Sequence, residues 1–165
     1  MNMKKNNTDK AFSKKLVSDF SVSLDLDKRL YKEDIQLSIA YSKALRKIDI
    51  LSYSEQKSIE KALKKIYQEI KKDKFEWRMD LEDIHMNIES RLFELIGDEA
   101  GYVHTARSRN DQVITDLKLW LRKANQEIIK NLNITINNLI KKANSNVETI
   151  MPGFTHLKNA QAVSF

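Results

Sequence analysis

The stretch from Asn110 to about Thr149 contains neither glycine nor proline. These two residue types are the strongest breakers of regular structure, so their absence favours one continuous helix. Apolar residues recur within it every three or four positions and form a single seam. This apolar seam consists of Leu117, Leu121, Ala124, Ile128, Leu132, Thr135, Leu139 and Ala143. A helix of about 40 residues is roughly 60 Å long, and long helices with such a seam are typical of helical bundles and coiled coils.

Most of the remaining chain is also predicted to be helical, because its few glycines and its single proline all lie beside two short segments. The predicted helices cover about Asp27–Ile48, a segment that follows a cap at Ser54, and about Leu81–Ile96 with Gly97 as its stop. In the first of these, Asp34 shares one side with Leu30, Leu37, Tyr41, Leu45 and Ile48. Asp98–Arg109 is predicted to be a loop. A Pro-Gly turn at Met151–Phe154 is predicted to end the long helix, and a new apolar segment follows it.

These elements predict an all-α fold. We expect a poorly ordered leader over residues 1–19, an N-terminal helical domain over 20–107 and the beginning of a helical bundle domain over 108–165.

Composition excludes several classes of protein. The chain has no cysteine, which rules out a disulfide scaffold, a thiolate metal site and a cysteine nucleophile, and fits a cytoplasmic location. Neither a signal peptide nor an apolar run long enough to cross a membrane is visible. The formal net charge is +6, but lysines alternate with acidic residues through Glu55–Lys74, as on a solvated helix face. We therefore expect no nucleic-acid partner and no membrane partner.

The loop directly before the long helix is the first candidate site. Helix N-termini favour anions, and Arg107 and Arg109 offer planar donors suited to carboxylates. Ser108, Asn110 and Gln112 add neutral hydrogen-bonding groups. The alternative is an ordinary capping loop in which Ser108 or Asn110 caps the helix and the arginines face solvent. Composition alone does not choose between the two.

Two histidines are further candidates. His156 follows the Gly153 turn beside Thr155 and has the chemistry of an acid, a base or an orienting group. For this motif considered alone, a structural role for His156 as a hydrogen-bonded residue is the more common explanation. His85 lies between Asp83 and Asn87, but a metal site is not expected there, because the chain has no His-x-x-x-His pair and no other cluster of ligand spacing.

Taken together, these segments resemble the argininosuccinate lyases. The resemblance extends from about Phe20 to Phe165 and rests on the following segments: Phe20–Ser23 with Asp27, Asp83–His85, Arg91–Gly97, His104–Gln112 and Pro152–Leu157. It implies an all-helical fold, a homotetrameric bundle of central helices and active sites shared among three subunits. The reaction it implies, part of arginine biosynthesis, splits argininosuccinate into arginine and fumarate without a cofactor or a metal.

The resemblance also implies roles for individual residues. His156 matches the catalytic histidine, and Ser23, Asn110 and Thr155 match substrate-binding positions. Positions that line the substrate site are matched by Ser108, Arg109, Asp27 and Asp83.

Some features depart from the family pattern. The family's later serine loop is absent, so we expect the 165-residue chain alone to be inactive. Lys158 stands where the family has glutamine, and Ala162 stands where it usually has proline. Two alternatives therefore stay open: a catalytically inactive helical oligomerisation protein derived from the family, or another lyase of the fumarase–aspartase superfamily. Turnover of argininosuccinate distinguishes an argininosuccinate lyase from these two alternatives.

Overall fold

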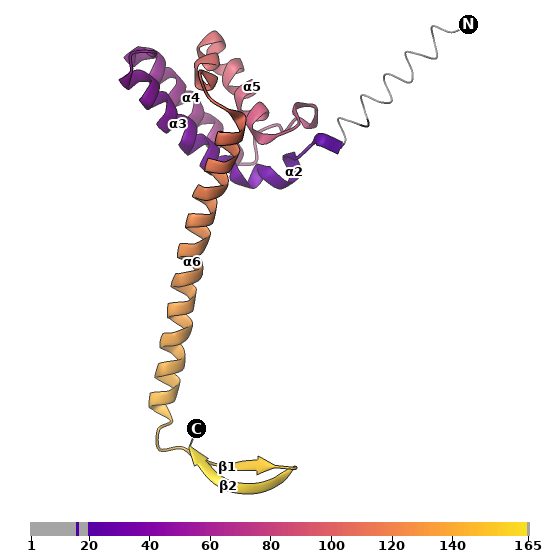
Figure 1. Cartoon of the computed structure of the whole chain (residues 1–165), viewed down its shortest axis with the longest axis vertical. Coiled ribbons are helices and arrows are strands. Elements are labelled where there is room, and N and C mark those ends of the chain that lie inside the picture. The colour runs from indigo at the N-terminus through magenta and orange to yellow at the C-terminus, as the bar shows by residue number, and fades with distance from the viewer. Residues whose placement is uncertain (1–15, 17–19, 165) are drawn as a thin grey trace, which may run out of the picture. The chain divides into compact units, whose positions relative to one another are not determined.

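The computed structural model describes residue 16 and residues 20–164. It has two compact units, and the line between them falls between Trp120 and Leu121, inside the long helix α6 (Arg109–Ser145). The two units are described separately below (Figure 1). The predicted leader over residues 1–19 lies outside the described residues, apart from Leu16.

The first unit is built from helices. In chain order, its elements before α6 are α2 (Leu24–Asp27), the 3-10 helix η1 (Lys28–Leu30), α3 (Tyr31–Lys47), α4 (Tyr53–Lys71), the 3-10 helix η2 (Met79–Leu81), α5 (Ile84–Ile96) and the 3-10 helix η3 (Gly97–His104). Helices α3 and α4 lie side by side, and α5 packs against α4 (Figure 1). The predominantly helical fold class is confirmed. No helix in the described part of the chain is both long and apolar enough to cross a membrane.

The core of this unit is formed by apolar residues that repeat at helical spacing. Ile59, Leu63 and Ile66 of α4 are completely buried, as expected from their spacing. From α5, Ile84, Ile88 and Leu92 are also buried, and Leu24, Ile35 and Leu45 complete the cluster from α2 and α3. The apolar faces of these helices therefore determine how the unit packs.

Several helix ends differ from the prediction. The first predicted helix is interrupted by η1, so that α3 begins only at Tyr31. Ser52, and not Ser54, caps α4: its hydroxyl accepts from the Glu55 backbone N–H at 3.2 Å, and the Glu55 carboxylate accepts from the Ser52 N–H at 2.7 Å. This reciprocal capping box needs a glutamate three residues after the serine, and Ser54 has none.

The ends of α5 and the segment after it show a mixed outcome. The helix begins at Ile84 because the Asp83 carboxylate accepts from the Met86 N–H at 2.7 Å. Gly97 has a φ of 64° and ends it, as predicted. The predicted loop after Gly97 is instead mostly η3, and the irregular part is confined to residues 105–108.

The second unit contains the rest of α6 and a hairpin of β1 (Ile150–Thr155) and β2 (Lys158–Ser164). The expected Pro-Gly turn is wrong, because Pro152 and Gly153 lie inside β1, where the pairing shifts at a bulge. The turn is formed by His156 and Leu157, whose φ angles are 47° and 62°. A two-residue hairpin loop with positive φ at both positions matches the twist of the flanking strands, although such angles are unusual for leucine.

The long helix is confirmed over Arg109–Ser145, and its apolar seam has no cover in the described chain. Leu121 is 44% exposed, Ile128 and Leu132 are each 56% exposed, and Leu139 is 63% exposed. From Leu121 to Ser145, no residue is buried. An apolar surface of this extent is larger than soluble monomers usually expose.

We predict that the chain self-associates through this seam. In sedimentation at micromolar concentration, the mass should exceed that of the 19.3 kDa monomer, because association removes apolar surface from water. The double variant Leu132→Lys/Leu139→Lys should shift the protein toward monomer. A matched variant, Asn137→Lys/Asn144→Lys, adds the same charge to exposed positions outside the seam and should leave the mass unchanged. A compact wild-type monomer would contradict this prediction.

Candidate functional site

Three helices bring buried polar side chains to one place in the first unit. Asp34 of α3, His85 of α5 and Asp116 of α6 are 1%, 2% and 0% exposed. His85 Nδ1 lies 3.0 Å from Asp34 Oδ1 and 3.8 Å from Asp116 Oδ2. Gln112 Nε2, from the first turn of α6, donates to the same Asp34 oxygen at 2.5 Å. Asp34 is thus the acceptor shared by α5 and α6.

Burial and hydrogen bonding separate the pKa values of the two carboxyl groups. Burial disfavours the charged form of Asp34, but hydrogen bonds from His85 and Gln112 hold its pKa below the ordinary value. Burial, together with the neighbouring charge of Asp34, raises the pKa of Asp116 to about 8. Burial also opposes the charged form of His85, yet the bond to Asp34 raises its pKa. At neutral pH, Asp34 is therefore ionised and Asp116 carries a proton.

The ionisation of Asp34 decides which ring nitrogen of His85 carries a hydrogen. A carboxylate only accepts hydrogen bonds, so the Nδ1 atom of His85 must be the donor in the 3.0 Å contact. Neither buried oxygen of Asp116 accepts a hydrogen bond from a donor in the described chain, whereas a side-chain hydrogen bond with Asp34 is among the causes that raise its pKa. A neutral carboxylic acid is less costly to bury in this way than a carboxylate.

The same cluster has the spacing of a metal site. Asp34, His85 and Asp116 each offer one ligand atom, and these atoms lie within 4.8 Å of one another. The expectation that no cluster of ligand spacing exists is therefore wrong, because the three residues come from different helices. The positive charge of Arg107 acts on both carboxyl groups and disfavours a second cation. The arrangement supports a hydrogen-bonded cluster better than a metal centre.

Hydrogen bonds continue from this cluster toward the surface. The Gln112 Oε1 atom accepts from Arg109 Nη1 at 2.9 Å. Arg109 then pairs with Glu89 of α5, with Nη1–Oε1 and Nη2–Oε2 distances of 2.9 and 3.0 Å. Glu89 Oε1 also lies 3.2 Å from His104 Nδ1. The half-buried guanidinium of Arg109 is therefore linked to buried Asp34 through one side-chain amide.

The predicted anion-binding loop separates into engaged and free side chains. Arg107 donates to Ser38 Oγ at 3.1 Å and lies 5.1 Å from the centre of the Tyr41 ring. These two contacts attach the loop to α3. Burial also lowers the pKa of Arg107. Ser108 and Asn110, by contrast, are exposed, and their side chains have no hydrogen-bond partner among residues 20–164.

A second group of predicted residues lies at the start of α5. Ser23 Oγ donates to Asp27 Oδ2 at 2.6 Å. The backbone N–H of Ser23 donates to the Glu82 carbonyl oxygen at 3.0 Å, which places this segment beside the Asp83 cap. Asp27 Oδ1 is buried without a partner within the described residues. The structure therefore brings Ser23, Asp27 and Asp83 together at the N-terminus of α5, the helix that also carries His85 and Glu89.

Thr155 and His156 belong to the hairpin of the second unit. Thr155 ends β1 and pairs with Lys158, the position that departs from the family pattern. His156 is exposed and is the first residue of the two-residue turn. These two residues are therefore not part of the groups that the first unit assembles.

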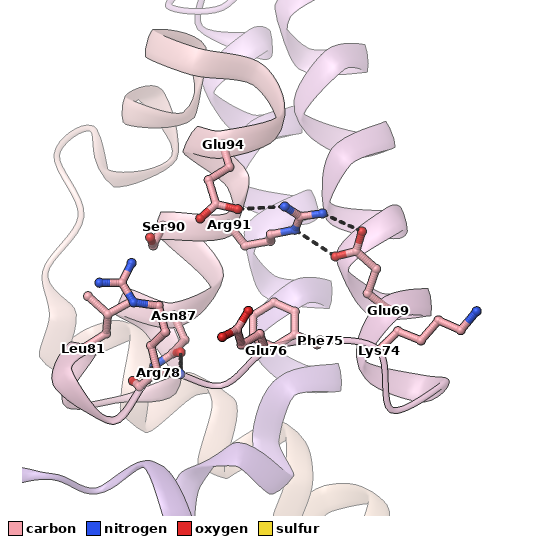
Figure 2. Close-up of a pocket in the computed structure, with 10 residues that line it drawn as sticks. All are labelled: Glu69, Lys74, Phe75, Glu76, Arg78, Leu81, Asn87, Ser90, Arg91 and Glu94. Atoms are coloured by element: carbon pink, nitrogen blue, oxygen red, sulfur yellow. Dashed lines mark hydrogen bonds and ion pairs between the residues drawn. The ribbon is translucent and has the colours of Figure 1, made fainter.

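A separate pocket of about 350 Å³ in the first unit contains none of the predicted site residues. Figure 2 shows Arg91 between Glu69 and Glu94 at this pocket, with Phe75 below them. Arg91 donates to both oxygens of Glu69 at 2.9 Å and to Glu94 at 2.7 Å. Because this guanidinium is already paired with two carboxylates, Arg91 is not a free group for an anionic ligand.

Sequence reasoning missed two members of the buried cluster. Asp34 left a signal, because it is an acidic residue on the apolar side of a predicted helix, where an unpaired charge is costly. Asp116 left none, since it lies among polar and apolar residues of the long helix without a distinctive neighbour.

We predict that Asp116 makes stability depend on pH. Its folded pKa of about 8 lies above the unfolded value of about 3.9. Between these values only the folded state holds the proton, so the free energy of unfolding falls as pH rises. The raised pKa of His85 acts in the same direction. In urea unfolding from about pH 6 to about pH 9, Asp116→Asn should lose less stability than wild type. Asp80→Asn, an exposed control, should follow wild type, and parallel curves for all three proteins would contradict the assignment.

Comparison with known proteins gives consistent matches. The sequence matches the protein family described as Lyase over residues 8–165. It is 59% identical over 143 residues to the argininosuccinate lyase of Pelagibacter ubique (strain HTCC1062), covering 87% of this chain and 31% of that protein. It is 48% identical over 149 residues to the argininosuccinate lyases of Azotobacter vinelandii and Pseudomonas putida, covering 90% of this chain and 32% of each.

The chain spans about a third of the length of the curated relatives it matches. The similarity to argininosuccinate lyases expected from the short motifs is confirmed over most of the chain. Because the family match extends through nearly all of the sequence, the chain belongs to the lyase family.

Proposed function

We propose that the protein containing this chain cleaves argininosuccinate into arginine and fumarate by elimination. The observation that carries the proposal is a pair of exposed side chains, Ser108 and Asn110, that have no hydrogen-bond partner within residues 20–164 and lie at the start of the 37-residue helix α6. Unpaired backbone N–H groups in the first turn of a helix add further donors and a positive dipole end. These groups together suit a substrate carboxylate.

The chemistry of the reaction requires such donors. In the elimination, a proton leaves the carbon next to a carboxylate while the C–N bond to the arginine part breaks. Negative charge accumulates on that carboxylate, and donors already in position lower the barrier. In this proposal Ser108 and Asn110 bind the carboxylate, and Arg109 adds positive charge beside them.

The remaining predicted residues keep their proposed roles. Ser23, Thr155, Asp27 and Asp83 bind or line the substrate, and His156 is the catalytic acid, base or orienting group. The hydrogen bond between Ser23 and Asp27, next to Asp83, supports a common role for these three residues. No cofactor and no metal takes part in the proposed reaction.

The assembly and the domain division belong to the same proposal. We propose that residues 20–107 form an N-terminal domain and that residues 108–165 begin the bundle domain of a homotetramer. The exposed apolar seam of α6 supports the bundle, because such a surface needs a partner. The cytoplasmic location stays a prediction.

An inactive assembly protein of the same family is the second candidate. It is favoured by two observations: Arg109 is already paired with Glu89, and Lys158 places a charge beside the His156 turn. A folded protein without turnover is the outcome that separates this candidate from the lyase.

A chimera provides the test, because this chain spans only about a third of its relatives. Residues 1–165 are followed by the corresponding remainder of the Pelagibacter ubique protein. We predict fumarate release by the wild-type chimera and none by the 165-residue chain alone. Asn110→Ala should lower kcat/KM by about tenfold or more, a loss of about 1.4 kcal/mol in the transition state.

Asn125→Ala serves as the matched control, because Asn125 is another exposed asparagine of α6. It should leave kcat/KM unchanged. Neither variant should shift the thermal midpoint, since exposed side chains without partners contribute little to stability. A folded wild-type chimera without fumarate release would overturn the proposed activity. Full kcat/KM in Asn110→Ala would instead remove only the role of this loop.

A further inference from the structure

The buried amide of Gln112 makes hydrogen bonds at both ends. It is 2% exposed, its Nε2 donates to Asp34 Oδ1 at 2.5 Å, and its Oε1 accepts from Arg109 Nη1 at 2.9 Å. At such low exposure, water has little access to the amide of Gln112. The amide therefore transmits the position of Asp34 to the guanidinium of Arg109.

The chemistry of its neighbours allows only one orientation of this amide. Asp34 is a carboxylate and accepts hydrogen bonds, while Arg109 has only donors. The NH2 end of Gln112 must consequently face Asp34, and its carbonyl must face Arg109. Asp34 is itself held from the opposite helix by the His85 bond of 3.0 Å, so its oxygen is a fixed reference for the amide.

A neutral residue at position 112 also avoids placing a second negative charge beside Arg109. Glu89 already forms two contacts with the guanidinium and balances one positive charge. A second carboxylate at 112 would surround Arg109 with two negative groups and repel Asp34. Glutamine orients the guanidinium without adding charge to it.

We propose that Gln112 and Asp34 are positioning residues that hold Arg109, and with it Ser108 and Asn110, in the orientation that binds a substrate carboxylate. This inference rests on the proposed function, because it takes the start of α6 as the substrate site. Gln112 and Asp34 do not touch the substrate; they act through Arg109 and through the first turn of α6.

The chain contains a matched control for Gln112. Gln56 is also buried, at 1% exposure, and its Nε2 donates to the carboxylate of Glu60 at 3.0 Å. Changing either glutamine to glutamate therefore creates the same conflict between two carboxylates. Of these two glutamines, Gln112 is bonded to Arg109 and Gln56 is not. A purely structural role predicts the same kinetic outcome for both variants.

The test measures kcat, KM and the thermal midpoint of the chimera, well below its unfolding temperature. Gln112→Glu should raise KM for argininosuccinate about tenfold, which corresponds to about 1.4 kcal/mol. Gln56→Glu should lower the thermal midpoint but leave KM within about twofold. If Gln112→Glu does not fold, the shorter pair Gln112→Asn and Gln56→Asn makes the same comparison. An unchanged KM in the folded Gln112 variant overturns the inference.

A second readout keeps the inference separate from the proposed activity. Nitrogen-15 NMR of the 165-residue chain reports rotation about the Nε–Cζ bond of Arg109. This rotation should be several-fold faster in Gln112→Asn than in wild type or Gln56→Asn, because one restraint on the guanidinium is lost. If the wild-type chimera is inactive and this NMR result is obtained, the proposed function is wrong, but the conclusion that Gln112 positions Arg109 still holds. Equal rotation in all three proteins would overturn the inference.

Discussion

A buried carboxylate at Asp34 is the constraint on which the rest of the first unit depends. An ionised group with 1% exposure must receive hydrogen bonds from the protein. Its donors come from His85 of α5 and Gln112 of α6. The need to satisfy one charge thereby adds a specific requirement to how α3, α5 and the start of α6 meet. That start carries Ser108 and Asn110, so the geometry of the proposed substrate site follows from a group that lies beneath it.

Both arginines of the loop are bonded to other side chains of the first unit. Both looked suited to gripping a carboxylate, yet Arg107 is bonded to Ser38 and Arg109 is paired with Glu89. They are engaged within the protein, while the neutral side chains of Ser108 and Asn110 are exposed and have no partner in the part of the chain that the structure describes. A positive charge that is held in place costs no reorganisation when a negative charge develops nearby. The loop therefore combines fixed cations with free neutral donors.

Periodicity in the sequence predicted the helices well, because buried apolar residues repeat locally along α4 and α5 and exposed apolar residues repeat along α6. It did not predict the cluster of Asp34, His85 and Asp116, because contacts between distant helices leave no spacing pattern. The hairpin was also missed. Its turn is made by His156 and Leu157, which are not typical turn residues, and its Pro and Gly lie within a strand. The motif residues of the first unit were found, but not the buried groups that support them.

The structure makes Asp34 an ionised acceptor that takes its hydrogen bond from the His85 ring. Nitrogen-15 NMR of the His85 ring at neutral pH tests it directly, because the shifts of the two nitrogens report which of them carries a hydrogen. We expect a hydrogen on Nδ1 that exchanges slowly with water, and we expect its hydrogen-bonded signal to disappear in Asp34→Ala. A ring with an unprotonated Nδ1, or one whose Nδ1 hydrogen exchanges as fast as that of an exposed histidine, would contradict it.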